Sequence, residues 1–225
     1  NYVLARPTIG FFGARRLSGL RHGPYRIQAM DAARFAQEVE HAMGLYDWPV
    51  VQAQLNLLGS HDTPRFLTMV GGDQTALQLA VLCQMTLPGA PCVYYGDELG
   101  LTGGYDPACR AAMPWDRLAE HQGDIWRTTK AAIALRKAHP VLRRGTYRTV
   151  LAAGDLLSYR RDLNGSLALV AFNAGMADAP VALPVDGPPL RVAYGAPEAF
   201  TQADGQVSMV IPARSGVVLV SEGSG

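Results

Sequence analysis

The chain has 225 residues, of which 48% are hydrophobic and 17% charged, and its formal net charge is +1 at pH 7. This composition is typical of a soluble globular protein with enough apolar side chains for one or two cores. The longest apolar runs, Leu79–Leu82 and Val217–Val220, are far shorter than the ~20 residues of a membrane-spanning helix. A nearly neutral chain also gives no electrostatic reason to expect a nucleic acid partner. We therefore expect neither nucleic acid nor membrane as a partner.

The chain begins with Asn1 rather than Met and enters apolar sequence at once, which favours a fragment of a longer parent. The compartment stays open, with the cytoplasm favoured, and a homo-oligomeric parent is an open alternative. The three cysteines, at positions 83, 92 and 109, have no C-x-x-C spacing and are odd in number. We therefore expect neither a disulfide framework nor a metal site from them.

The first 140 residues alternate helical patterns with short apolar runs that are typical of strands. Asp31 and Asp124 stand where helix N-caps are expected. Strand–helix alternation with short connections predicts right-handed βα units on a parallel sheet. The predicted helices cover about residues 31–45, 74–85 and 124–137, and the predicted strands are a strand-like opening at 3–12, Gln54–Leu58 and Pro91–Tyr95.

From about Val141 the pattern changes to short β-rich runs separated by turn dipeptides. Helical periodicity is absent there, and several turns have the Asn-Gly or Asp-Gly sequence that joins antiparallel strands. We predict a small antiparallel sandwich or barrel, with its boundary near Pro140. The runs are Leu156–Arg160, Leu167–Phe172, Val181–Val185, Val207–Ile211 and Val217–Val220.

Ionisable residues follow two successive predicted strands, at the edge where βα units collect functional groups. In one interpretation His61 and Asp62 face a cleft and bind a polar substrate through charge-assisted hydrogen bonds. In the alternative, Asp62 caps a helix that starts at Thr-Pro, and Arg65 is solvated. For Asp97 and Glu98 we favour a structural role, as a buried carboxylate pair satisfied by loop amides and a nearby arginine.

The loop 101–110 is rich in Gly and Pro, yet carries Asp106 and Arg110 four residues apart. The pair either lies over the cleft and clamps hydroxyl groups, or forms a local ion pair, which is worth only about 0–1 kcal/mol if exposed. The residues alone leave both interpretations open. The basic stretch Gly13–Arg26 is expected to be a solvated loop, with an anion site as the alternative.

Two long motifs resemble the α-amylase family (glycoside hydrolase family 13). Leu57–Arg65, reading LLGSHDTPR, is similar to the fourth conserved motif of that family. Pro88–Arg110, reading PGAPCVYYGDELGLTGGYDPACR, and Met113–Asp116 resemble its eighth-strand region. The similarity is to the neopullulanase, cyclomaltodextrinase and maltogenic amylase branch, and with weaker likeness at Asn1-Tyr2 and along the helices it covers nearly the whole chain.

The resemblance implies an α/β fold that consists of the C-terminal part of a (β/α)8 TIM barrel followed by an all-β antiparallel sandwich domain. It assigns residues 1–140 to about strands six to eight of the barrel with their helices. It assigns residues 141–225 to the C-terminal β-domain of the family. The Gly13–Arg26 loop is longer than in typical relatives, and the resemblance gives it no role.

The resemblance also implies roles for single residues. Asp62 corresponds to the third essential carboxylate, which binds sugar hydroxyls and stabilises the distorted, transition-state-like ring. His61 corresponds to the neighbouring substrate-binding histidine. Asp106 and Arg110 match residues that contact a sugar further along the non-reducing side. No metal or other cofactor is implied.

The implied activity is retaining hydrolysis or transfer at α-1,4-glucosidic bonds of malto-oligosaccharides, cyclodextrins or pullulan. A retaining glycosidase needs a nucleophile and an acid about 5–5.5 Å apart, and nothing here matches the fourth- and fifth-strand motifs that supply them in the family. We therefore expect the chain alone to be inactive, with the missing N-terminal barrel segment as partner and an α-glucan as substrate. The alternative is a non-catalytic carbohydrate-binding or interaction relative.

Overall fold

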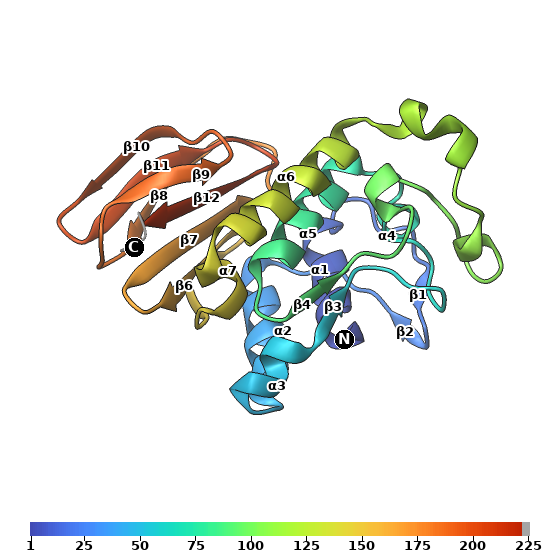
Figure 1. The fold of residues 1–225 in the computed structure, drawn as a ribbon, viewed down its shortest axis with the longest axis horizontal. Helices are drawn as coiled ribbons and strands as arrows, with labels where there is room; N and C mark the ends of the chain where they lie inside the picture. The colour runs from blue at the N-terminus through green and yellow to red at the C-terminus, as the bar shows by residue number, and fades with distance from the viewer. Residues whose placement is uncertain (222–225) are drawn as a thin grey trace.

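The computed structural model describes residues 1–221, so the last four residues of the predicted β-domain lie outside the described range. Helices and a small parallel sheet form one side of the molecule, and two antiparallel sheets form the other (Figure 1). The helices are α1 (Tyr2–Phe12), α2 (Ala32–Gly44), α3 (Trp48–Ala53), α4 (Phe66–Met69), α5 (Gln74–Thr86), α6 (Asp124–Ala138) and α7 (Pro140–Arg144), with 3-10 turns η1 (Asp97–Leu99), η2 (Ala108–Arg110) and η3 (Trp115–His121). The strands are β1 (Arg21–His22), β2 (Tyr25–Arg26), β3 (Leu55–Leu57), β4 (Ala90–Cys92), β5 (Arg148–Ala153), β6 (Leu156–Leu163), β7 (Ser166–Asn173), β8 (Ala179–Pro184), β9 (Leu190–Tyr194), β10 (Glu198–Ala203), β11 (Gln206–Ile211) and β12 (Ser215–Ser221).

The three predicted helices are confirmed as α2, α5 and α6. Asp31 caps α2 as expected, because its carboxylate accepts a hydrogen bond from Arg34 N at 2.9 Å. The predicted cap at Asp124 is wrong by one residue. Gly123 is the N-cap of α6, and Asp124 lies in the first turn, where its negative charge suits the positive end of the helix dipole.

The predicted strand-like opening is wrong, since residues 2–12 form helix α1. Eight of these eleven residues are buried, including Leu4, Ile9 and Phe12. A helix covered on nearly all sides shows no apolar stripe, so its periodicity does not identify it. The helix contains Pro7, and Thr8 Oγ1 donates to Leu4 O at 2.6 Å one turn earlier.

Strands β3 and β4 pair in parallel, with Leu55 opposite Ala90 and Leu57 opposite Cys92. Strand β3 lies within its predicted run, whereas β4 begins one residue before its predicted run and ends three residues earlier than predicted. Helix α5 connects them, so β3, α5 and β4 form one βα unit of the predicted kind. The loops that follow the two strands therefore leave the sheet at the same edge.

The β-rich end of the chain is a sandwich of two antiparallel sheets, ordered β5-β6-β7-β12-β9 and β10-β11-β8. The five predicted β-runs are confirmed as β6, β7, β8, β11 and β12. The sequence did not predict β5, β9 and β10, which have more exposed residues and weaker alternation. One core lies between the sheets and contains Leu169 and Leu219 of the larger sheet and Leu183 and Met209 of the smaller one.

The larger sheet is also buried on its other face. Val170, Phe172 and Val218 belong to the core that the helices form, and the Phe172 ring lies 5.2 Å from that of Phe12. Successive residues of β7 therefore alternate between two cores, as the two-residue period of a strand requires. The helical part and the sandwich pack as one body through this sheet.

Two arginines at this junction are buried with main-chain carbonyls as their hydrogen-bond partners. Arg161 of β6 is fully buried and donates to Thr86 O, Leu142 O, Gly145 O and Thr146 O. Arg136 of α6 donates in the same way to the carbonyls of Met85, Leu87, Gly89 and Leu142. Several of these carbonyls end α5, where the helix dipole is negative, so the charges are stabilised there although no carboxylate pairs with them within residues 1–221.

Among residues 1–221 no helix combines the length and apolarity needed to cross a bilayer. All three cysteines are free, and Cys83 and Cys109 are buried.

The hairpin β1–β2, within the stretch predicted to be a solvated loop, is mostly exposed but buries one residue. His22 is 1% exposed, its Nε2 has no hydrogen-bond partner, and its ring packs edge-on against that of Tyr2 at 5.6 Å. Burial and, to a smaller extent, the charge of Arg6 lower the pKa of His22 to about 4. The buried imidazole is therefore neutral at physiological pH.

Replacing Arg161 by Met should lower the free energy of unfolding by about 3 kcal/mol or more, because a buried carbonyl left without a donor costs about 1–3 kcal/mol. Urea unfolding of the chain measures the change. Arg148→Met, at the exposed start of β5, is the matched control and should change stability by no more than about 0.5 kcal/mol. Equal effects of the two substitutions would contradict the role given to the buried guanidinium.

The buried His22 should make the chain lose stability as the pH falls from 6.5 to about 4. In this window the unfolded state binds a proton at position 22 that the folded state does not, so the free energy of unfolding decreases by up to about 3 kcal/mol. His22→Gln, which cannot be protonated, should remove this part of the pH dependence. Parallel stability curves for the wild type and the variant between pH 4 and 7 would show that His22 titrates normally.

Candidate functional site

The residues after β3 form a tight polar turn at Gly59–Thr63. Ser60 N donates to Thr63 Oγ1 at 3.2 Å, and Asp62 N donates to Ser60 Oγ at 3.1 Å. Asp62 caps no helix, because α4 begins only at Phe66 with Arg65 as its N-cap residue. The capping interpretation of Asp62 is therefore wrong, and its carboxylate stays available for other contacts.

Arg65 anchors this turn to the loop after β4. The prediction that Arg65 is solvated is wrong: its side chain is fully buried and donates to Tyr95 O at 2.7 Å and Asp97 Oδ1 at 2.8 Å. Its guanidinium also lies 4.6 Å and 4.9 Å from the ring centres of Tyr94 and Tyr95, within cation–π range. The structural role proposed for Asp97, with a nearby arginine as partner, agrees with these contacts.

Asp97 is buried and lies directly against the turn at Gly59. Burial raises its pKa to about 7, and the charge of Arg65 opposes this rise. A Cβ atom at Gly59 would lie only 2.9 Å from Asp97 Oδ2, so this position requires glycine for the carboxylate to pack beneath the turn. Asp97 thus supports the turn from below.

The loop after β4 returns to the turn through η2. Arg110 Nε lies 2.9 Å from His61 O, to which it donates, and 3.0 Å from Asp106 Oδ1. Arg110 Nη2 lies 3.9 Å from Asp62 Oδ1. The local ion pair between Asp106 and Arg110 is therefore present, and the same guanidinium also reaches the turn after β3. Cys109 Sγ adds a contact with His61 O at 3.3 Å.

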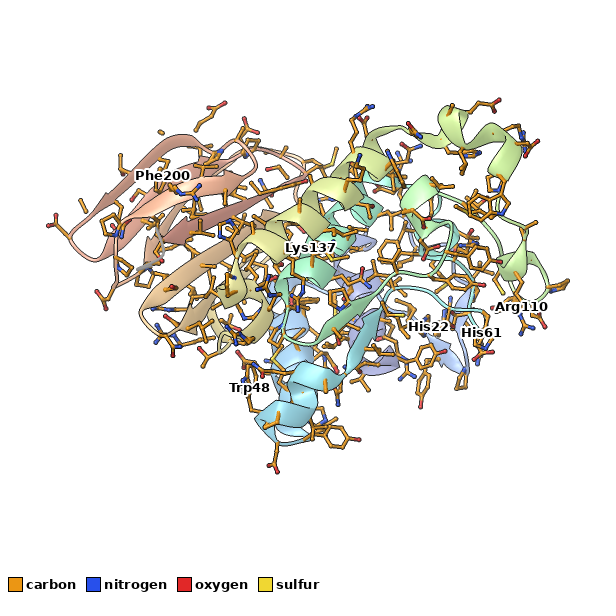
Figure 2. The ribbon with its side chains drawn as sticks, viewed as in Figure 1. His22, Trp48, His61, Arg110, Lys137 and Phe200 are labelled. Atoms are coloured by element: carbon orange, nitrogen blue, oxygen red, sulfur yellow. The ribbon has the colours of Figure 1, made fainter. Side chains whose placement is uncertain are left out.

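The four residues singled out from the sequence thus form one cluster at the edge where β3 and β4 end. His61 Nε2 lies 3.3 Å from Asp62 Oδ1, and the side chains of both residues are more than half exposed. Figure 2 shows His61 and Arg110 at the same end of the molecule, far from Phe200 of the sandwich. The cluster combines two carboxylates, an imidazole and a guanidinium that can donate to or accept from neighbouring hydroxyl groups of a polar ligand.

Sequence reasoning missed the contact of Tyr2 with this cluster and the link of Tyr105 to the hairpin. Tyr2 Oη lies 2.9 Å from Ser60 Oγ and 3.4 Å from Asp62 Oδ2. The hydroxyl of Tyr105 accepts a hydrogen bond from Arg21 N at 2.7 Å, which joins the hairpin to the loop of Asp106. The family likeness at Asn1-Tyr2 was the one signal at this position, and it gave Tyr2 no role because the segment around it reads as a strand rather than as the first turn of α1.

Within residues 1–221 no group of three or more His, Cys, Asp or Glu side chains is arranged to hold a metal ion.

The segment that carries this cluster is similar in sequence to known proteins. The family model described as the α-amylase catalytic domain matches residues 17–123, which include His61, Asp62, Asp106 and Arg110. Cyclomaltodextrinase of Geobacillus thermopakistaniensis is 37% identical over 188 residues, which are 83% of this chain and 30% of that protein. Neopullulanase 2 of Thermoactinomyces vulgaris is 38% identical over 149 residues, which are 66% of this chain and 23% of that protein.

Solved structures agree with these sequence matches. The debranching enzyme of Nostoc punctiforme in its native form superimposes with a TM-score of 0.89 at 36% identity, over 97% of this chain and 46% of the other. The chain therefore spans less than a third of the length of these two curated relatives and less than half of this solved structure. Its fold is that of the α-amylase family, and by sequence and structure alike the chain belongs to that family of glycoside hydrolases.

Proposed function

We propose that this chain is the C-terminal portion of a retaining enzyme that hydrolyses or transfers α-1,4-glucosidic bonds. Its substrates would be malto-oligosaccharides, cyclodextrins or pullulan, and it would need no metal or other cofactor. Asp62 stabilises the positive charge that develops on the sugar ring, and His61 binds the hydroxyls of that sugar. Asp106 and Arg110 bind a sugar further along the glucan chain.

The observation that carries the proposal is the meeting of these four residues from two separate loops. Arg110 donates to the main chain of His61 and lies near both carboxylates, so the loops after β3 and β4 form one polar surface. A fixed negative charge at Asp62 would stabilise an oxocarbenium-like transition state more than the uncharged ground state. The names of the curated relatives, which include cyclomaltodextrinase and neopullulanase, support an α-glucan as the substrate.

The nucleophile and the general acid come, in this proposal, from a preceding barrel segment. Strands β3 and β4 would be the seventh and eighth barrel strands, and among residues 1–221 they pair only with each other. Leu55 of β3 is 57% exposed, and the amino group of Asn1 already donates to its carbonyl. An unpaired strand edge with an exposed leucine favours pairing with further strands. We propose that the missing segment pairs along this edge.

In the complete enzyme, Asp62→Asn should lower kcat about a thousandfold, comparable to removing one electrostatic group that stabilises a transition state. The fold should be retained, because the side chain is 59% exposed and caps no helix. Steady-state kinetics on maltotriose and β-cyclodextrin measure the effect. Asp204→Asn, in a turn of the sandwich, is the matched control and should leave kcat unchanged; a normal kcat for Asp62→Asn would remove Asp62 from the role assigned here.

The 225-residue chain by itself should show no turnover of maltotriose or cyclodextrins, because a retaining mechanism needs two carboxyl groups about 5–5.5 Å apart across the scissile bond. Product analysis after long incubation at high protein concentration tests this expectation. Adding the preceding segment as a separate polypeptide should restore activity if the two pair along β3. Turnover by the chain alone would show that the reacting carboxyl groups lie within it. Inactivity of the complete enzyme on every α-glucan would favour a non-catalytic binding or interaction role.

A further inference from the structure

The hairpin β1–β2 contacts the candidate site at two points, although the family resemblance gives its loop no role. Arg21 N donates to Tyr105 Oη at 2.7 Å, beside Asp106. His22 packs against the ring of Tyr2, the residue that reaches Asp62. Figure 2 labels His22, His61 and Arg110 at the same end of the molecule. The hairpin therefore lies behind the cluster and supports it.

Tyr2 connects the first turn of α1 to the polar turn after β3. Its hydroxyl lies 2.9 Å from Ser60 Oγ and 3.4 Å from Asp62 Oδ2. The phenol is the donor in both contacts, since a carboxylate can only accept, and its one hydrogen is shared between Ser60 Oγ and Asp62 Oδ2. Ser60 Oγ in turn accepts from Asp62 N. Tyr2 thus contacts Asp62 directly through the carboxylate and indirectly through the serine that holds its main chain.

Few other contacts fix the orientation of this carboxylate. The side chain of Asp62 is 59% exposed, so packing does not hold it in one rotamer. Its other polar neighbours are His61 and Arg110, whose side chains are 65% and 47% exposed. Tyr2 differs from both because its ring packs against His22, which is buried. A donor on a packed ring holds a carboxylate more firmly than donors on mobile side chains.

We propose that Tyr2 is a positioning residue that orients the Asp62 carboxylate for the transition state, with His22 of the hairpin packed behind its ring. This inference rests on the proposed function, since it gives Asp62 a carboxylate that must point at the reacting sugar. Without the phenol hydroxyl, Asp62 would keep its charge but sample more orientations. The substrate would still bind, while the charge would be less often in place when the bond breaks.

The test is Tyr2→Phe in the complete enzyme, assayed on maltotriose and β-cyclodextrin. The ring stays in place against His22, and only the hydroxyl is lost. We expect kcat to fall about tenfold with KM changed by less than about twofold, the pattern of an interaction made in the transition state. The thermal unfolding midpoint should stay unchanged. Tyr25→Phe, on the hairpin that carries His22 and with no hydrogen bond to its hydroxyl among the described residues, is the matched control and should leave both constants unchanged.

A double-mutant cycle separates positioning from a structural role. If Tyr2 acts through Asp62, Tyr2→Phe should change the residual rate of Asp62→Ala by less than about twofold, because the group that it orients is gone. The same tenfold loss in both backgrounds would overturn the proposal, and so would a normal kcat for Tyr2→Phe in an active enzyme. A wild type that acts on no α-glucan would instead overturn the proposed function, and the proposal for Tyr2 with it.

Discussion

The candidate site depends on one buried contact, the ion pair between Arg65 and Asp97. The parallel pairing of β3 and β4 brings the ends of two loops to the same edge, but it does not fix how the loops lie. Arg65 does so, because it belongs to the first loop and donates to Tyr95 O and Asp97 of the second. Arg65 N also donates to Gly103 O at 2.9 Å, and Gly103 N donates to Thr68 Oγ1 at 2.8 Å. Burial of both charges makes loss of either partner costly, so the exposed residues above them are presented on a rigid base.

Above this base the polar residues are open to solvent and are held by few contacts. A buried base with exposed polar side chains suits a site that binds sugars. Exposed carboxylate and guanidinium groups can exchange hydrogen bonds to water for hydrogen bonds to sugar hydroxyls at little cost in free energy. Arg110 illustrates the arrangement. It contacts the main chain of His61 with Nε and still leaves other nitrogens free to face a ligand. The same two loops therefore contain both the buried residues Arg65 and Asp97, which fix the loops, and exposed residues such as Asp62 and Arg110, which can reach a ligand.

The sequence predicted those parts of the fold in which local pattern and environment agree. Helix α2 has an apolar face and a capping Asp31, and β7 has turn signals at its ends, so both were found. Helix α1 was mistaken for a strand because burial on nearly all sides removes the amphipathic stripe.

For the candidate site, the motif resemblance identified Asp62 and Arg110. It did not predict the observed contacts of Tyr2, Arg65 or His22. Their roles arise from contacts between segments distant in sequence, and neither periodicity nor spacing encodes such contacts.

The two buried arginines at the junction have a consequence for how the sequence can change over evolution. Arg136 and Arg161 recognise main-chain oxygens, and every residue type offers such an oxygen. These hydrogen bonds therefore place no demand on the side chains of the acceptor residues, and other contacts limit those side chains instead. Thr86 is fully buried with its hydroxyl 2.6 Å from Tyr159 Oη, and a Cβ atom at Gly145 would lie 2.4 Å from Val141 O. The arginines themselves have no such freedom, since lysine lacks the planar fork that serves several carbonyls at once. The junction therefore requires the guanidinium group at both positions, while its partners need to keep only their backbone path and their packing.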